Sequence, residues 1–481
     1  MNNQPPTNRK GGIIIDTLRL GFVSVVRPLF KGDTEQAIHK SLTGLNTLAT
    51  DMGFEVVEFA PASDANSAKD AAEKIQHANV DFLLIQHTTF ATGDLLEPLL
   101  TAHPRVGVWA LPETAGERGH TGPLPLNALC GLNMTLSFLD HPNVNKREPV
   151  KWFYGDVDSA VFKERLGITL AALRGLIATR NARILQIGGT APNFWGIEEH
   201  PDLVHVHVDT MTLEDIFTKI ATVPDEAGRE RAHAWAQQEP LEAPFEHLVQ
   251  AARVELALQD VAHAGDYTAL ALRCWPEFAD ACGAMVCGSV GRMGDHHVPT
   301  ACEGDVMGAL SMLALQGISQ QPTILMDLSD YDATDDSLLF WHCGNAPIYW
   351  AAQPGSRLTT HFNRDGVGVV RDMVLRPGDA TGFRLLNGGK DAVIVSGKFD
   401  QPEKASFDGV RGWFFDMHWN GQKTDGQAVI ANILDRRLPH HLAFGTGQLT
   451  ASLQEYCAWL GAGVLEPHPY QTSLYTPQVQ P

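Results

Sequence analysis

The sequence predicts an α/β protein with two successive Rossmann-like, doubly wound domains followed by a β-rich C-terminal domain. Strand-like and helix-like segments alternate over residues 18–111 and again over 156–275, a pattern typical of parallel sheets with helices on both faces. Beyond residue 320, short apolar runs are separated by Gly and Pro, which favours mainly β structure. The expected domains are residues 1–150, 151–318 and 319–481.

The first expected domain contains four apolar strand-like runs, at residues 18–26, 54–60, 80–86 and 105–111. Asp33 and Gln36 form a capping signal for a helix that ends at Gly53. A further helix is expected over 93–102. Ligands of such sheets bind at the carboxyl ends of the strands, where Arg27 lies.

The second and third expected domains follow a turn-rich boundary over 112–126 and 141–149. Thr212 and Asp215 mark the start of one helix, and Pro276 marks the start of another. Helices are also expected over 156–180 and 243–264. Strands are expected at 183–189, 203–208, 267–275, 322–327, 337–342, 367–375, 392–399 and 411–417.

Composition limits the classes of partner. The 481 residues include 56 acidic and 36 basic side chains, and a net charge of −20 argues against nucleic-acid or anionic-membrane binding. No apolar run reaches the roughly 18 residues that a membrane span needs. The N-terminus lacks the pattern of a signal peptide, and the seven cysteines are an odd, scattered set. We therefore expect reduced thiols and a cytoplasmic location.

Polar residues that could carry chemistry concentrate between residues 295 and 345. Glu303 precedes a helical pattern, which places its carboxylate in the first helical turn, while Asp327 and His342 each end a predicted strand. His440 and His441 add a later pair of imidazoles. Two carboxylates with one or two imidazoles suit Mn²⁺, Mg²⁺ or Co²⁺. The alternative is that the two acids are only a helix cap and a strand-end turn residue.

Other candidates have plainer interpretations beside the functional ones. The glycine-rich loop 188–196 is not a dinucleotide fingerprint, and Cys302 is expected to be a small buried side chain rather than a nucleophile. His296 and His297 are expected in a loop near the site. Trp195 and Trp275 either stack on a sugar or simply pack. The expected solvated turn acids are Asp305, Asp330, Asp332, Asp335 and Asp336.

Several motifs together resemble the L-fucose/L-arabinose isomerase family. They are RCWPEF (273–278), PTACEGDVMGAL (299–310), MD (326–327), HCGNAP (342–347) and LPHHLAFG (438–445). The segments at 24–33, 85–94 and 123–134 are similar to the shorter, fucose-isomerase-like branch.

The resemblance implies a three-domain, Mn²⁺-dependent aldose–ketose isomerase that forms a homo-oligomer, often a hexamer. By match to the motifs, Glu303 and Asp327 correspond to the two metal-binding acid/base carboxylates and His441 to the C-terminal metal ligand. His342 matches a histidine that binds metal in the arabinose branch. Because that branch has Glu where this chain has Asp327, His342 either binds the metal or contacts the substrate.

The sugar itself stays open. The resemblance allows a neutral sugar such as L-fucose, D-arabinose or L-arabinose, or a sugar with an acidic group at C6, such as sulfoquinovose. Arg27, Lys31 and Arg292 are the candidates for binding such an anion. The rival functions are a non-catalytic sugar-binding protein and an NAD-dependent sugar dehydrogenase, against which the missing glycine fingerprint argues.

Overall fold

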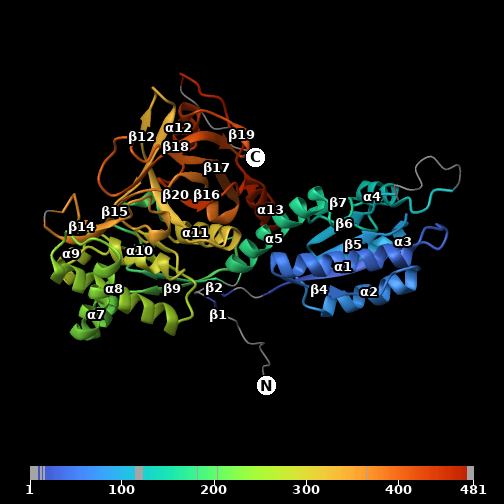
Figure 1. Ribbon diagram of the computed structural model, residues 1–481, viewed down its shortest axis with the longest axis horizontal. Coiled ribbons are helices and arrows are strands. Elements are labelled where there is room, and N and C mark those ends of the chain that lie inside the picture. Colours follow the sequence, from blue (N-terminus) through green and yellow to red (C-terminus); the bar gives the residue numbers. More distant parts are fainter. Residues whose placement is uncertain are drawn as a thin grey trace. The chain divides into compact units, whose positions relative to one another are not determined.

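The structure, a computed structural model, describes residues 9–10, 13–14, 17–113, 123–180, 182–202, 204–364 and 366–473. The chain divides into two compact units, with the division at Leu173–Arg174 inside helix α5 (Ala160–Arg180). Figure 1 shows the helices and strands of both units. The three-domain boundaries expected from the sequence stay a prediction.

The first unit contains a five-stranded parallel sheet with the order β4-β3-β5-β6-β7. This order is one of the common doubly wound arrangements, so the first Rossmann-like sheet is confirmed. The fifth strand, at 150–154, was not predicted. The strands are β3 (Leu18–Val25), β4 (Phe54–Glu58), β5 (Phe82–His87), β6 (Val106–Ala110) and β7 (Val150–Tyr154).

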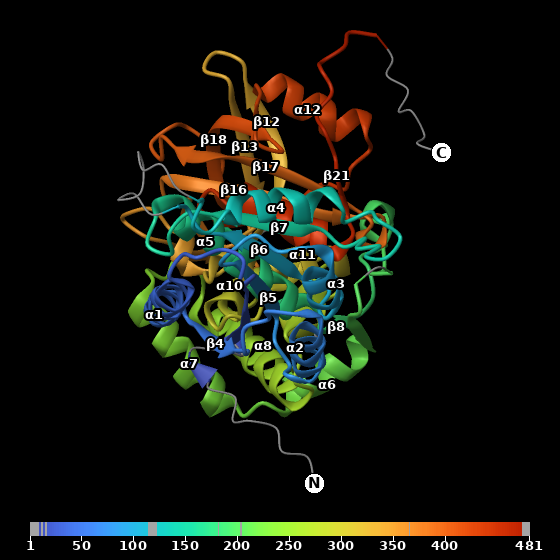
Figure 2. The same ribbon diagram turned by 90° about the vertical axis from the view of Figure 1, so that its right-hand side faces the viewer.

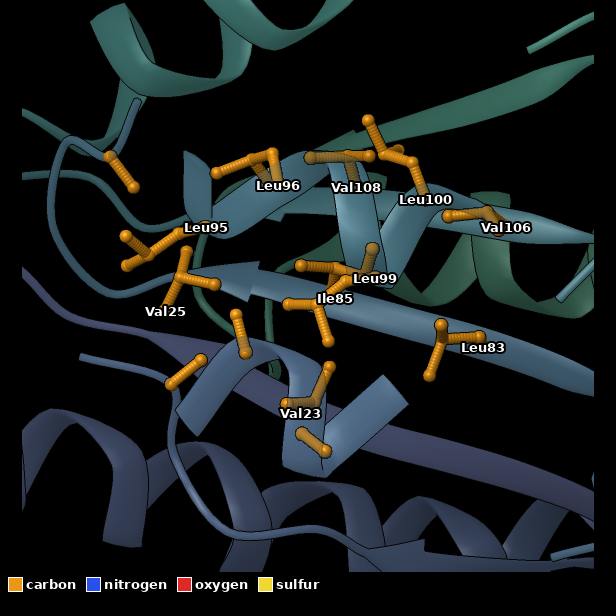
Figure 3. Packing of buried hydrophobic residues seen from close by; sticks show 14 of the residues in the cluster. Val23, Val25, Leu83, Ile85, Leu95, Leu96, Leu99, Leu100, Val106 and Val108 are labelled. Atoms are coloured by element: carbon orange, nitrogen blue, oxygen red, sulfur yellow. The ribbon is translucent and has the colours of Figure 1, made fainter. Parts of the chain in front are cut away.

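In the first unit, α1 begins and ends where the sequence signals predicted, α3 matches the expected range 93–102 to within one residue, and α4 was not predicted. The Asp33 side chain accepts a hydrogen bond from the Gln36 N–H at 3.0 Å, and Gly53 ends α1 in the left-handed conformation. Leucines of α3 pack against the valines and isoleucines of β5 and β6 in the core (Figure 3). The helices are α1 (Thr34–Met52), α2 (Ala65–His77), α3 (Gly93–Thr101) and α4 (Ala128–Ser137).

The second unit begins with another parallel sheet, in the order β11-β10-β8-β9. The strands are β8 (Arg183–Ile187), β9 (His207–Met211), β10 (Ala269–Leu272) and β11 (Thr300–Cys302). The strand expected over 203–208 starts only at His207, because Val204 and Val206 form a tight turn joined by a backbone hydrogen bond of 2.7 Å.

Helices surround this second sheet, and Thr212 caps α6 through the Asp215 N–H as predicted. They are α6 (Leu213–Thr222), α7 (Asp225–Gln238), α8 (Phe245–Ala264), α9 (Phe278–Cys282), α10 (Cys287–Asp295) and α11 (Val306–Ser319). Two short strands, β1 (Arg9–Lys10) and β2 (Ile13–Ile14), pair with each other.

A closed antiparallel barrel of six strands follows, in the order β12-β13-β18-β17-β16-β20 and back to β12 (Figures 1 and 2). Phe340, Phe399, Phe414 and Phe444 contact one another in its core. The barrel strands are β12 (Ile324–Asp332), β13 (Ser337–His342), β16 (Gly378–Leu386), β17 (Asp391–Asp400), β18 (Val410–Trp419) and β20 (His441–Thr446). The β-rich C-terminal region is therefore confirmed.

The remaining elements of the second unit flank the barrel. They are β14 (Arg357–Thr360), β15 (Gly368–Val374), β19 (Gln422–Lys423), β21 (Gly463–Val464), α12 (Gly426–Asp435) and α13 (Thr450–Leu460). Among the residues that the structure describes, no helix is both long enough and apolar enough to cross a bilayer.

Candidate active site

Glu303 lies at the carboxyl end of β11, held in an unusual backbone conformation. Its φ is +64° and that of Gly304 is +75°, both in the left-handed region. The Ala191 N–H donates to the Glu303 carbonyl at 2.8 Å, and the Gly304 N–H donates to Leu272 at 3.0 Å. A Cβ atom at residue 304 would lie 2.1 Å from the Gly189 carbonyl oxygen, so this turn requires glycine. The loop after β8 and the last residue of β10 thus fix the Glu303 backbone.

Asp305, not Glu303, caps helix α11. Its side chain accepts a hydrogen bond from the Gly308 N–H at 2.7 Å, and it is completely buried, so the expectation of a solvated turn acid was wrong. The Arg384 guanidinium donates to both carboxylate oxygens, at 2.5 and 2.9 Å. Burial would raise the pKa of Asp305, but the Arg384 charge and the bond with His441 outweigh it and hold that pKa well below its usual range.

His441 is oriented by Asp305. Its Nδ1 lies 2.8 Å from the Asp305 carboxylate, which can only accept, so Nδ1 carries the proton and Nε2 keeps its lone pair in the neutral ring. Nε2 lies 3.5 Å from the Glu303 carboxylate and 3.7 Å from that of Asp327. Asp327 is directly opposite His441 across β12 and β20, which brings the two side chains together.

His342 ends β13 and belongs to the same cluster, with the opposite tautomer. Its Nδ1 accepts from the Cys343 backbone N–H at 2.8 Å, so Nε2 carries the proton in the neutral ring. Its ring centroid lies 5.6 Å from that of His441. Burial would lower the pKa of His342, but Cys343 and the Asp327 carboxylate outweigh it and raise that pKa. His342 Nε2 is thus arranged as a donor toward the cluster.

Three buried polar atoms of this cluster have no hydrogen-bond partner within the described part of the chain. They are Asp327 Oδ1, His342 Nε2 and His441 Nε2. Buried polar atoms are normally satisfied, so an unpartnered group of this kind indicates a ligand or ion. Within each of two sets the potential ligand atoms lie within 4.8 Å of one another: Glu303, His440 and His441, and Asp327, His342 and His441.

His440 extends the cluster toward solvent. Its Nε2 lies 3.0 Å from the Glu303 carboxylate. Burial would raise the pKa of Glu303, but the bond with His440 and the nearby imidazoles outweigh it and lower that pKa. Burial would also lower the pKa of His440, and the bond with Glu303 reverses this effect. Glu303 is therefore an ionised carboxylate near neutral pH, poised to accept a proton.

Aromatic side chains next to His440 form the solvent-exposed rim of the cluster. The Phe194 ring centroid lies 5.8 Å from that of His440 and 6.3 Å from that of Trp275. Trp275 is 40% exposed. Trp195, in a short 3₁₀ helix over Trp195–Ile197, is 75% exposed. Both tryptophans are therefore exposed to solvent, and Trp275 is linked through Phe194 to the cluster.

The two arginines proposed from the sequence as anion ligands are both engaged. Arg27, in the first unit, donates to Asp94 at 2.5 Å and also bonds Thr92. Arg292 is buried in α10 and pairs with Glu239 at 2.9 Å. The structure does not bring Arg292 into the cluster. The roles of both arginines toward a substrate stay predictions.

The plainer interpretations hold for several other candidates. Cys302 is completely buried, and a hydrogen bond with Cys274 together with burial raises its pKa well above the usual value for a thiol. His296 bonds the buried Glu255 at 2.8 Å. Asp332 is the last residue of β12 and pairs with Lys404 at 2.8 Å.

Comparison with known proteins supports the resemblance. No family model matches the chain. A sulfoquinovose isomerase of Priestia megaterium is 29% identical over 322 residues, which cover 65% of this chain and 70% of that protein. The protein of the same name from Alkalicoccus urumqiensis is 27% identical over 392 residues, or 78% and 83% of the two chains. That of Clostridium sp. (strain MSTE9) is 31% identical over 206 residues, or 41% and 46%.

A solved structure also aligns, but its similarity to this chain is too low to support a conclusion about fold or function. An ABC-transporter solute-binding protein from Agrobacterium vitis, bound to α-D-tagatopyranose, is 13% identical, with a TM-score of 0.17 over 63% of this chain and 85% of its own.

These relatives show that the chain is an enzyme of the aldose–ketose isomerase class. This replaces the alternative of a non-catalytic sugar-binding protein. Within that class, the chain is similar to the proteins named sulfoquinovose isomerase, at 27–31% identity.

Proposed function

We propose that this enzyme converts sulfoquinovose to sulfofructose with a divalent metal ion, Mn²⁺ first, held by Glu303, Asp327 and His441. The observation that carries the proposal is the convergence of two carboxylates on the unpartnered Nε2 of His441. The names of the relatives supply the substrate class.

The residues fit such an ion. Two carboxylates and one imidazole form an oxygen-rich set that suits Mn²⁺, Co²⁺ or Mg²⁺ better than a soft metal. The bond from His441 Nδ1 to Asp305 is the usual way in which a protein fixes the tautomer of a ligating histidine. When bound, the ion would stabilise negative charge that develops on the two sugar oxygens next to the reacting carbons.

The side chains of this site supply the proton transfers. An aldose becomes a ketose when a proton leaves C2 and returns at C1, while the hydroxyl and carbonyl oxygens exchange a proton. Glu303 and Asp327 are the two candidate bases. The hydrogen bond from His440 lowers the pKa of Glu303 and so favours its ionised form. The same bond places the Nε2 proton of His440 next to the Glu303 carboxylate. His342 Nε2–H is placed to donate to a sugar oxygen rather than to bind the ion.

The test begins with metal-stripped enzyme and measures ketose formation by NMR. Sulfoquinovose, its neutral 6-deoxy analogue quinovose, L-fucose, L-arabinose and D-arabinose are each supplied with Mn²⁺, Co²⁺ or Mg²⁺. We expect activity only after metal is restored, best with Mn²⁺, and a preference for the sulfonated sugar. Full activity in the stripped enzyme would contradict the proposed metal requirement. Turnover of neutral sugars alone would contradict the proposed sulfonated substrate. The homo-oligomer and the cytoplasmic location stay predictions.

A further inference from the structure

We propose that Arg364, whose guanidinium lies over the Trp275 ring, forms the subsite that binds the anionic sulfonate end of the substrate. This inference rests on the proposed function, because it names the group that selects a sulfonated sugar over a neutral one. Neither residue is needed for the chemistry at C1 and C2, which the carboxylates and histidines carry out. The subsite therefore determines specificity.

The turn that carries Arg364 borders the cluster on the His342 side. It lies between β14 and β15 and is closed by hydrogen bonds from the His361 N–H to Val367, at 2.7 Å, and from the Arg364 N–H to His361, at 3.1 Å. Within this turn, the Phe362 ring lies 5.3 Å from that of Trp341. Trp341 precedes His342 in the chain, and their rings are nearly parallel, with centroids 6.5 Å apart.

The Arg364 guanidinium itself reaches the other side of the rim. It lies over the Trp275 ring, 5.8 Å from the centroid. Trp275 follows the carboxyl end of β10 and connects through Phe194 to His440, which bonds Glu303. Two separate series of ring contacts thus connect the Arg364 turn with the histidines of the cluster.

Charge pairing distinguishes Arg364 from its neighbours. Arg273, at the same sheet edge, is held by Glu277, and Arg384 is held by Asp305. Arg292 and Arg371 share Glu239. For Arg364 no carboxylate partner occurs among the described residues, although the chain carries a net charge of −20. A partly buried guanidinium that has no acid partner in the described part of the chain is suited to an external anion.

The chemistry of the ligand fits this position. A sulfonate is ionised at every pH at which a protein stays folded, and its oxygens can accept two parallel hydrogen bonds from a guanidinium. Attraction to the indole face favours the guanidinium in this position, and its N–H groups can donate within the guanidinium plane. Glu303 and Asp327 would repel the sulfonate, so the anion lies away from the carboxylates, with C1 and C2 next to them. The positive charge of Arg364 and the negative charges of Glu303 and Asp327 together determine how the sugar is oriented in the site.

The experiment compares sulfoquinovose with quinovose, which differ only in the sulfonate. In Arg364→Ala and Arg364→Gln we expect kcat/KM for sulfoquinovose to fall about tenfold to a hundredfold, the range for a lost hydrogen bond to a charged group, mainly through KM. The value for quinovose should not change, and Arg364→Lys should recover part of the loss. Arg376→Ala is the matched control, because Arg376 likewise stacks on a ring, that of Tyr349 at 3.8 Å.

The outcomes separate the subsite from the proposed function. If the wild type converts sulfoquinovose and Arg364→Ala does so equally well, the subsite is wrong while the function stands. Equal losses on both sugars would show a structural role for Arg364 and would also overturn the subsite. If the wild type converts quinovose but not sulfoquinovose, the proposal of a sulfonated substrate is wrong, and the proposal of a sulfonate subsite is wrong with it.

Discussion

Replacement of Asp305 by Asn tests how the cluster is built. Asn has nearly the same size, but it is neutral, and its amide nitrogen donates where a carboxylate oxygen accepts. Asp305 is completely buried and accepts from Arg384, His441 and Gly308. One amide cannot satisfy all three donors, and Arg384 is left as a buried charge without its carboxylate. Removing one partner of a buried pair costs about 3–5 kcal/mol, and we expect the free energy of unfolding to fall by that amount.

The same substitution should weaken metal binding separately from stability. His441 loses the carboxylate that fixes its tautomer, and loss of such an outer partner typically reduces metal affinity about 10–100-fold. Calorimetric titration with Mn²⁺ measures the affinity, and urea unfolding measures the stability. Glu239→Gln is the control, because Glu239 pairs with the fully buried Arg371, and the bonds given for Glu239 go to Arg371, Arg292 and Ser356, not to the cluster. It should lose comparable stability and keep its Mn²⁺ affinity. Equal affinities in Asp305→Asn and the wild type would refute the reasoning.

The sign of the pH dependence provides a second check on Asp305. Its folded-state pKa is depressed, so its contribution to stability is complete above the ordinary aspartate pKa of about 4 and is lost as the pH falls below that value. The difference in unfolding free energy between the wild type and Asp305→Asn should therefore be constant near neutral pH and narrow in acid. A difference that grows on acidification would contradict the assignment of a depressed pKa.

Four further predictions concern the remaining parts of the site. Glu303→Gln and Asp327→Asn should each reduce turnover at least about 100-fold in a steady-state assay. Near-normal turnover in either variant would show that the replaced residue takes no part in the proton transfers. His441→Ala should mainly lower Mn²⁺ affinity, measured by titration, with His440→Ala milder. Gly304→Ala should impair folding, seen as a lower melting temperature, because the new Cβ meets a carbonyl oxygen at 2.1 Å. Isomerisation in D₂O should place deuterium at C1 or C2; complete retention of protium over many turnovers would instead favour a hydride shift.

Local signals in the sequence predicted the parts of the fold that depend on neighbouring residues. Asp33 and Gly53 mark the two ends of α1, and Thr212 marks the start of α6, because caps act within one helical turn. Strand β16 was not predicted, since its polar start, GDATG, does not alternate. Closure of the barrel was not predictable either, because it depends on the pairing of β17 with β18 and of β20 with β16, and no local pattern specifies such pairings.

The same distinction separates the site residues that were found from those that were missed. The E-G-D motif pointed to Glu303, but the role of Asp305 depends on Arg384, which is 79 residues away on a strand that was not predicted. A buried, paired aspartate and a solvated turn aspartate look alike in a single sequence. Asp305 does carry one readable signal, the D-x-x-G spacing to Gly308, where a Cβ would lie 2.4 Å from the Asp305 carboxylate. Arg364 had no such signal, since only the folded turn places it on Trp275.

The arrangement of the second unit explains why this cluster needs both its parallel sheet and its barrel. The sheet supplies Glu303 from a left-handed turn that would relax if the loop after β8 and the end of β10 did not hold it. The barrel supplies Asp327 and His441 from two adjacent antiparallel strands, whose register places them opposite each other. Asp305 and Arg384 join the two parts, because a cap of α11 is bonded to both β16 and β20. We therefore expect a change in this buried pair to alter the distance between the Glu303 and Asp327 carboxylates, and with it the proposed metal site.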